Sequence, residues 1–493
     1  MRQLLPEGPV TALPGAGGTT HAAARDAVVP LLAALTGVVA FTLGPLYLLP
    51  VLALAAWYAV VRIAAVPAAV LPWVAAFALL GDKMVLSTGV GGGSGLLRLG
   101  PILTVALLVA MLVADANTRQ AATDVVRWGA PAALVVALGV VLPLVGVLID
   151  YPVRTATAIA IPLATGAFLV FGVLVARSGV DRDRVGYLML VVVTSIAAVT
   201  GLLLFLFNRG ITLPLAATLD QWGIATSEAY GTLWLRGRVS GVYTNPNVLA
   251  TLGGLALVFA AFARLQPRQR IALIVPSLAI LFVTQSRGVL VGVAAAVLVG
   301  FVFRERRREM VRWQVIVVWV LIVVLAIGAV VGAAVVFPQY LEALTGRVVS
   351  AVRILTEGAE ADRNFAGRVA FWGSAWDLLQ QRALGTFGPP ELLLGTAVDN
   401  DYLRFALQGG FLYAGAWVLY LGWLMGTGLR RATNRFIGAG AVFLALTALT
   451  QTSSTYVMIV GMFSLFVGMH IEQIRASALG AEARCVHETT GEG

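Results

Sequence analysis

Residues 398–403, Val-Asp-Asn-Asp-Tyr-Leu, place an acid directly before a long apolar run. In this position Asp399 could act as a general base that takes a proton from a hydroxyl group. Two other interpretations remain open. Asp399 and Asp401 could hold a divalent metal ion against a diphosphate, or the acids could cap the helix that follows. The base is our leading interpretation, and we expect no metal site.

Arginines at the edges of apolar runs form the second group of reactive side chains. A guanidinium at the hydrocarbon boundary is costly unless an anion or a polar cavity compensates it, and its forked donors match a diphosphate. For any single arginine, snorkelling to lipid headgroups is the alternative. Several arginines on one polar loop system favour a diphosphate site that stabilises charge on a leaving group. They are Arg236, Arg238, Arg287, Arg363, Arg368 and Arg404.

Composition identifies the kind of scaffold that must position these residues. Hydrophobic residues make up 59% of the chain and charged residues only 12%, so the chain needs lipid to cover its apolar surface. We predict an all-α, polytopic membrane protein with about 12–14 transmembrane helices. The predicted spans are 28–43, 45–61, 63–81, 96–114, 128–149, 155–176, 185–207, 247–263, 270–284, 288–303, 313–336, 402–427, 436–451 and 454–470.

Basic loops predict the orientation of these spans, because cytoplasmic loops carry an excess of arginine and lysine. With both termini in the cytoplasm, the basic loops 177–184, 264–270, 304–312 and 428–435 all fall inside. Topology and anionic lipid explain these loops, so we expect no nucleic-acid partner. The polar segments then lie outside: the loop Asn208 to Thr244, the turn at Arg287, the segment 337–401, and the turn from Gln451 to Ser454.

This orientation limits the chemistry that is available outside. The three histidines, His21, His470 and His487, fall on the cytoplasmic side or at its boundary, so a carboxylate must supply any outer base. The single cysteine, Cys485, excludes an internal disulfide. We read the glycine-rich run Gly89 to Gly95 as a flexible outer loop and not as a phosphate loop, because a phosphate loop follows a strand and opens a helix, whereas our prediction places this run in an outer turn between two membrane helices.

The long segment 337–401 has helical periodicity. Apolar residues recur at three and four positions over 341–355 and again over 369–383, which predicts two amphipathic helices that lie on the membrane surface as a lid. The predicted organisation is 1–27 (cytoplasmic tail), 28–207 (amino-terminal membrane bundle), 208–336 (membrane region with the outer arginine motifs), 337–401 (extracytoplasmic catalytic segment), 402–470 (carboxyl-terminal membrane helices) and 471–493 (cytoplasmic tail).

The order of the short motifs over residues 200–425 resembles that of the O-antigen ligase and Wzy-type polymerase superfamily. Each motif alone is weak, whereas their order and spacing together are fairly specific. In chain order they are RVSGVYTNPNVLA from Arg238, TQSRG from Thr284, GRVAFW from Gly367, GTFG from Gly385, DNDYL from Asp399 and GG at Gly409.

The resemblance implies a GT-C-like membrane glycosyltransferase of the bacterial cytoplasmic membrane. It would move a glycan with inversion from a polyprenyl diphosphate, which is a substrate carrier, to a hydroxyl of a glycan, lipid or cell-wall acceptor. No cofactor or metal would be needed. Asp399 would be catalytic, and Arg238, Arg287 and Arg368 would hold the donor diphosphate. The supporting residues in the same motifs are Asn247, Asn400, Tyr402 and Arg404.

One position bears on the choice between polymerase and ligase. Lipopolysaccharide ligases typically carry histidine where this chain has Asp399, and polymerase-like members commonly have Asp-Asn there, so the resemblance favours a polymerase. Two rivals from other classes remain. A secondary transporter should have matching halves and ionisable residues within its spans, whereas here the charges lie at the span ends. A flippase for lipid-linked sugars would also need arginines for a diphosphate.

Overall fold

The computed structural model describes most of the chain from residue 85 onward. The described residues are 85–88, 95–149, 155–208, 245–303, 356–358, 360, 363–388, 390, 394, 398–451 and 457–490. Several predicted features lie outside these residues. They are the spans 28–43, 45–61, 63–81 and 313–336, the surface helix at 341–355, and the site residue Arg238.

Apart from one short hairpin, the elements in the described part of the chain are helices, which confirms the all-α prediction. The antiparallel hairpin pairs β1 (Val85–Thr88) with β2 (Gly95–Arg98). The helices are α4 (Leu99–Ala114), α5 (Ala116–Trp128), α6 (Ala130–Leu148), α7 (Thr155–Arg177), α8 (Arg182–Asn208), α11 (Pro246–Phe262), α12 (Pro267–Thr284), α13 (Arg287–Val302), α16 (Arg363–Gln381), α18 (Asp401–Leu429), η3 (Ala432–Asn434), α19 (Arg435–Thr447) and α20 (Val457–Thr490).

The apolar helices identify a multi-pass membrane protein. Among the described residues, five helices are long and apolar enough to cross a membrane: α6, α8, α12, α18 and the part of α7 from Ile159 onward. Helices α11, α13 and α19 are apolar but shorter. Each predicted span that falls on described residues overlaps one helix, because a run of about 20 apolar residues is both the sequence signal and the physical requirement for crossing the bilayer.

Three elements differ from the sequence interpretation. The predicted span 96–114 is wrong at its start, since residues 96–98 belong to β2 and the helix begins at Leu99. The polar helix α5 contains no long apolar run, so the sequence pattern does not predict it. Its N-cap, Asp115, accepts hydrogen bonds from Asn117 N and Thr118 N, and the hydrogen bond from the Thr118 hydroxyl, with these, lowers the pKa of Asp115. Helix α20 continues through the predicted tail to Thr490.

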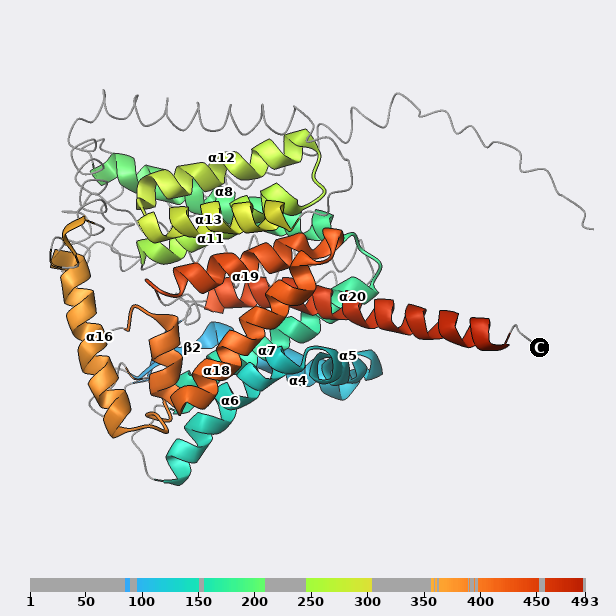
Figure 1. Ribbon diagram of the computed structural model, residues 1–493, viewed down its shortest axis with the longest axis horizontal. Coiled ribbons are helices and arrows are strands. Elements are labelled where there is room, and N and C mark those ends of the chain that lie inside the picture. The colour runs from blue at the N-terminus through green and yellow to red at the C-terminus, as the bar shows by residue number, and fades with distance from the viewer. Residues whose placement is uncertain are drawn as a thin grey trace, which may run out of the picture.

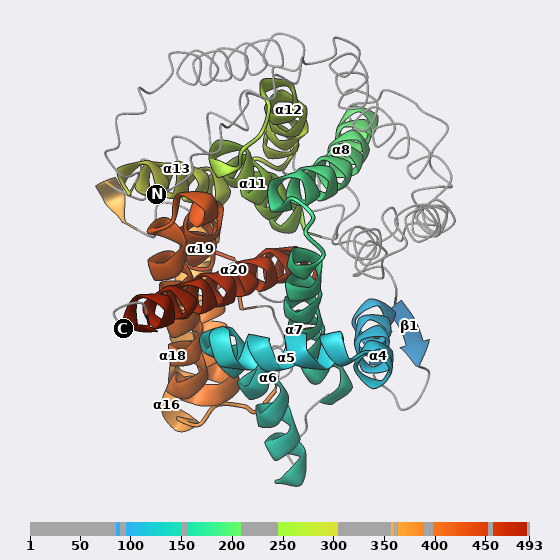
Figure 2. The ribbon, with the colours of Figure 1, turned by 90° about the vertical axis from the view of Figure 1, so that its right-hand side faces the viewer.

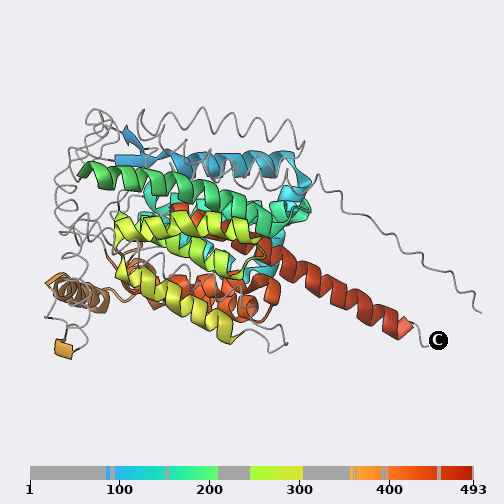
Figure 3. The same ribbon diagram turned by 90° about the horizontal axis from the view of Figure 1, so that it is seen from above.

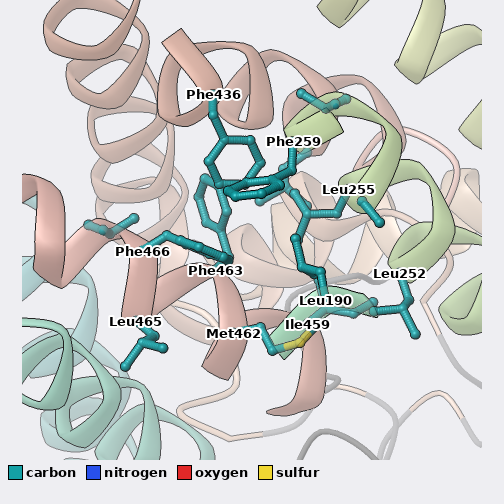
Figure 4. Close-up of a cluster of buried hydrophobic side chains, with 14 of the residues drawn as sticks. Leu190, Leu252, Leu255, Phe259, Phe436, Ile459, Met462, Phe463, Leu465 and Phe466 are labelled. Carbon is teal, nitrogen blue, oxygen red and sulfur yellow. The ribbon is translucent and has the colours of Figure 1, made fainter. Parts of the chain in front are cut away.

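The core lies where α8, α11, α19 and α20 meet. Helix α11 is buried along nearly its whole length, and the Phe259 ring on it packs edge-on against Phe436 of α19, with ring centroids 4.9 Å apart. Phe466 of α20 completes this aromatic group (Figure 4). Where α7 crosses α20, a Cβ on Gly172 would lie 2.8 Å from the Gly468 Cα. Glycine at both positions therefore allows the two backbones to touch, as is common between membrane helices.

The bundle has two distinct ends. Helix α16 lies across one end, and the last turns of α20 project from the opposite end (Figures 1 and 3). Three of the predicted cytoplasmic loops meet at the end from which α20 projects. Arg182 donates to Asn434 (2.6 Å) and to Gln473 (3.1 Å), and the Arg264 N–H donates to Asp183 (2.9 Å). The loop 304–312 lies outside the described residues.

Helix α5 lies across the same end, beside α7 and α20 (Figure 2). An ion-pair cluster holds the three helices together. Arg177 of α7 pairs with Asp124 of α5 and, at 3.1 Å, with Glu472 of α20. Arg475, one turn further along α20, also pairs with Glu472 (2.5 Å). The charges of this cluster balance, which stabilises the base of the α20 extension.

Helix α18 is broken near the end at which α16 lies. Gly409 and Gly410 have non-helical backbone angles, and φ of Gly410 is +64°. We call the part before the break α18a (Asp401–Gln408) and the part after it α18b (Phe411–Leu429). A small apolar cluster packs α18a against α16, separately from the main core. Its buried members are Ala375, Leu379, Val398, Ala406 and Leu407.

Candidate functional site

The first turn of α18a orders the segment that contains the predicted base. Asn400 is the N-cap, and its side-chain oxygen accepts a hydrogen bond from Leu403 N at 3.0 Å. The N-cap interaction satisfies one of the free N–H groups at the helix start. The cap interpretation of this motif therefore applies to Asn400, and Asp399 precedes the cap.

The same segment also satisfies free carbonyl groups at the end of α19. The last carbonyls of a helix have no partner within it, so they need donors from elsewhere. Three successive residues supply such donors: Asn400 Nδ2 to Leu449 O (3.2 Å), Asp401 N to Ala448 O (2.8 Å) and Tyr402 OH to Ala445 O (2.9 Å). Asn400 and Tyr402, both predicted as supporting residues, thus fix the start of α18a on the end of α19.

Asp399 forms an ion pair with Arg368 of α16. The distance from Arg368 Nη2 to Asp399 Oδ2 is 3.3 Å, and about a third of each side chain is exposed. The other terminal nitrogen of Arg368 donates to Thr450 O at 3.1 Å. Asp399 is therefore a water-accessible carboxylate in a defined position, which a proton acceptor requires.

The two acids of the Asp-Asn-Asp motif have different surroundings. Asp401 is completely buried, whereas Asp399 is exposed by about a third. In the part of the chain that the structure describes, no three His, Cys, Asp or Glu side chains are grouped as a metal site would require. Whether the reaction needs a metal ion stays a prediction.

Arg287 begins α13 next to the same turn. Gln285, two residues before Arg287, is buried and adopts the left-handed conformation, with φ of 50°. A Cβ on Gly288 would lie 2.6 Å from Thr450 Oγ1, so the first turn of α13 packs directly on Thr450. Since the carbonyl of Thr450 also accepts from Arg368, the structure brings the predicted residues Arg287, Arg368 and Asp399 around one turn.

Asn247 contributes to the same end of the bundle from α11. The Ser286 hydroxyl is 3.4 Å from Asn247 Oδ1, which links the start of α11 to the turn before α13. One helical turn along, Thr251 accepts a hydrogen bond from the buried Gln451 side chain at 2.6 Å. Asn247 is therefore part of a polar connection between α11, the α12–α13 turn and the residues after α19.

Arg404 lies one turn into α18a and is half-buried. Its Nη1 nitrogen lies 3.5 Å from the side-chain oxygen of Gln408. Gln408 itself is 4% exposed. Arg404 is therefore on the same half-helix as Asp401 and Tyr402, but it lies toward the break in α18.

Sequence reasoning did not select the turn Thr450–Gln451 as part of the site, although it placed Gln451 outside. This turn contacts α11 through Gln451, α13 through the Thr450 side chain and α16 through the Thr450 carbonyl. The available signal was the hydroxyl-rich run from Thr447 to Thr455 between two apolar runs. Its carbonyl contacts carry no sequence signal, because every residue type has a backbone carbonyl.

Comparison with known families gives one match. Residues 272–429 match the O-antigen ligase family model, and the match ends at the last residue of α18. It includes Arg287, Arg368, Asp399 and the residues Asn400, Tyr402 and Arg404, whereas Arg238 and Asn247 precede it. No curated protein and no solved structure matches the chain.

Proposed function

We propose that this chain uses its O-antigen ligase domain to transfer or polymerise a glycan that arrives on a polyprenyl diphosphate. The observation that carries the proposal is the Arg368–Asp399 pair, which lies inside the matched domain and is open to water. Its end of the bundle is opposite the gathered basic loops. By the positive-inside rule the pair then faces the exterior of the bacterial cytoplasmic membrane, and both termini are cytoplasmic.

In the proposed reaction, Asp399 takes the proton of an acceptor hydroxyl. The hydroxyl oxygen forms a bond to the anomeric carbon of the donor sugar, on the face opposite the diphosphate. The bond from the anomeric carbon to the diphosphate oxygen breaks, and its electron pair leaves with the polyprenyl diphosphate. Configuration at the anomeric carbon is inverted. Proton transfer, orientation and charge stabilisation account for the rate without a cofactor.

The arginines divide between two tasks in this proposal. Arg287 stands at the start of α13, where the positive end of the helix dipole adds to its charge, so we assign it to the donor diphosphate together with Arg238. Arg368 already directs its two terminal nitrogens to Asp399 and Thr450. Contact between Arg368 and the diphosphate would therefore be additional to its role at the carboxylate.

The acceptor is a hydroxyl of a glycan, a lipid or the cell wall. An acid and not a histidine at position 399 favours a polymerase-like reaction, in which a growing chain is transferred to a lipid-linked repeat unit. Transfer of the finished polysaccharide by a ligase is the alternative. Both reactions use the same donor chemistry, so they share the site around Asp399 and Arg287.

A purified-protein assay tests the proposal against transport. The protein is reconstituted in vesicles with a lipid-linked oligosaccharide, and free polyprenyl diphosphate is measured. A transferase releases polyprenyl diphosphate and lengthens or transfers the glycan, whereas a flippase or transporter moves the intact lipid-linked sugar. Translocation without release of the carrier would contradict the proposed function.

A further inference from the structure

The loop after α16 lies directly against the break in α18, backbone to backbone. Thr386 N donates to Leu407 O at 2.6 Å, which places the loop against the last turn of α18a. A Cβ on Gly385 would be 2.7 Å from both Gly409 N and Leu407 O. A Cβ on Gly410 would be 2.6 Å from Ala383 O. Side chains at these two positions would force the loop and the helix apart.

We call the contact of Ala383, Gly385 and Thr386 with the break in α18 the interlock. It joins two helical segments, which we call arms, at the end that lies away from Asp399. One arm is α16, which has Arg368 near its start and the interlock loop after its end. The other arm is α18a, with Asp399 just before its start and the break at its end. Ala375 and Leu379 on the first arm pack between the two contacts against Ala406 and Leu407 of the second. The arms are thus joined at the interlock, along their length, and at the ion pair.

We propose that Gly385 is a positioning residue, which holds Arg368 at the carboxylate of Asp399 by allowing the loop after α16 to lie against the break in α18. The inference rests on the proposed function, since it assigns the ion pair to catalysis. Gly385 has φ of +87°, a conformation that residues with a Cβ rarely adopt. Both its backbone angle and its surroundings therefore require glycine.

A Cβ at residue 385 should change the geometry of the Arg368–Asp399 pair at the other end of the two arms. The loop must move away from α18a, because contacts as short as 2.7 Å to backbone atoms are not tolerated. Arg368 moves with α16, and the 3.3 Å contact to Asp399 lengthens. Misplacement of about 1 Å at a catalytic centre can reduce the rate by about a hundredfold. The donor site at Arg287 lies on another helix, so donor binding is expected to change little.

The experiment compares Gly385→Ala with Gly373→Ala in the reconstituted release assay with lipid-linked oligosaccharide. Gly373 is on α16, the helix that precedes this loop, and a Cβ there has no atom within 4 Å, so Gly373→Ala is the matched control. We expect kcat of Gly385→Ala to fall by about ten- to a hundredfold with KM within about twofold, and the control to match the wild type.

Coupling to Arg368 distinguishes positioning from a general loss of structure. If Gly385 acts through the ion pair, Gly385→Ala should have a smaller effect in an Arg368→Lys background than in the wild type. Equal effects in both backgrounds would overturn the proposal, as would a Gly385→Ala variant with the kcat of the control. Asp399→Asn is assayed in parallel. If this variant retains more than a tenth of the wild-type rate, the assignment of Asp399 as the base in the proposed function is wrong, whatever the glycine variants show.

A milder change keeps the test decisive if Gly385→Ala does not fold. Thr386 is 1% exposed, and its hydroxyl donates to Gly388 O at 2.7 Å within the same loop. Thr386→Val removes this bond with little change in volume and keeps the N–H that donates to Leu407 O. We expect kcat to fall several-fold with KM within about twofold. A kcat equal to that of the wild type would overturn the proposal.

Discussion

Replacing Asp399 by asparagine removes the proposed base while it keeps the shape of the side chain. The amide can still accept a hydrogen bond from Arg368, so the contact now measured at 3.3 Å need not be lost. The amide cannot take the proton of an acceptor hydroxyl at neutral pH. The substitution therefore separates the chemistry of the carboxylate from its packing.

The structure sets different magnitudes for stability and for activity. Both partners of the ion pair are exposed by about a third, and such pairs contribute about 0–1 kcal/mol to stability after solvent screening. Loss of a general base costs about two to four orders of magnitude in rate, which is about 2.7–5.4 kcal/mol in the activation barrier. The predicted loss of activity is thus larger than any loss of folded protein could explain.

The assay measures release of polyprenyl diphosphate by purified Asp399→Asn in vesicles, together with its thermal stability in detergent. Asp377→Asn is the matched control, because Asp377 is an exposed acid on α16, the helix that carries Arg368. We expect the control to retain activity and the Asp399 variant to be folded but nearly inactive. More than a tenth of the wild-type rate in a stably folded Asp399 variant would refute the assignment of Asp399 as the base.

The other predictions concern the donor, the metal and the product. Arg238→Lys and Arg287→Lys keep the charge but lose the forked donors, so each should raise the KM for the lipid-linked donor; normal turnover in both would contradict the diphosphate site. Activity should survive EDTA, whereas loss that magnesium or manganese restores would favour a metal held by Asp399 and Asp401. Deletion of the protein should leave single lipid-linked repeat units on the polyprenyl carrier, and full-length polymer accumulating there would establish a ligase.

The membrane helices could be predicted from the sequence because their main physical requirement is local. The predicted spans 155–176 and 247–263 match α7 and α11 to within one residue at each end. An apolar run shows its own length, and the charges or prolines that bound it show where it ends. Helix α5 was missed for the same reason, since its polar surface gives it no such run.

The geometry of the candidate site depends on contacts between distant parts of the chain. The DNDYL motif identified Asp399, but nothing local indicates that Arg368 is its partner or that Asn400 and Tyr402 also serve the end of α19. The Gly409–Gly410 pair was noted as a motif. Its structural meaning, a break against which another loop packs, required the position of Gly385 in space.

The position of Arg368 has a physical explanation in the helix that ends beside it. The C-terminal end of α19 has partial negative charge, and the carboxylate of Asp399 lies at the same turn. A single ammonium group would be a point charge between these two acceptors. The guanidinium instead directs one terminal nitrogen to Thr450 O at 3.1 Å and the other to Asp399 at 3.3 Å, and its planar fork fixes the angle between the two contacts. The end of α19 thereby orients the arginine, and the arginine orients the carboxylate, so the proposed base is held by the fold itself before any substrate is bound.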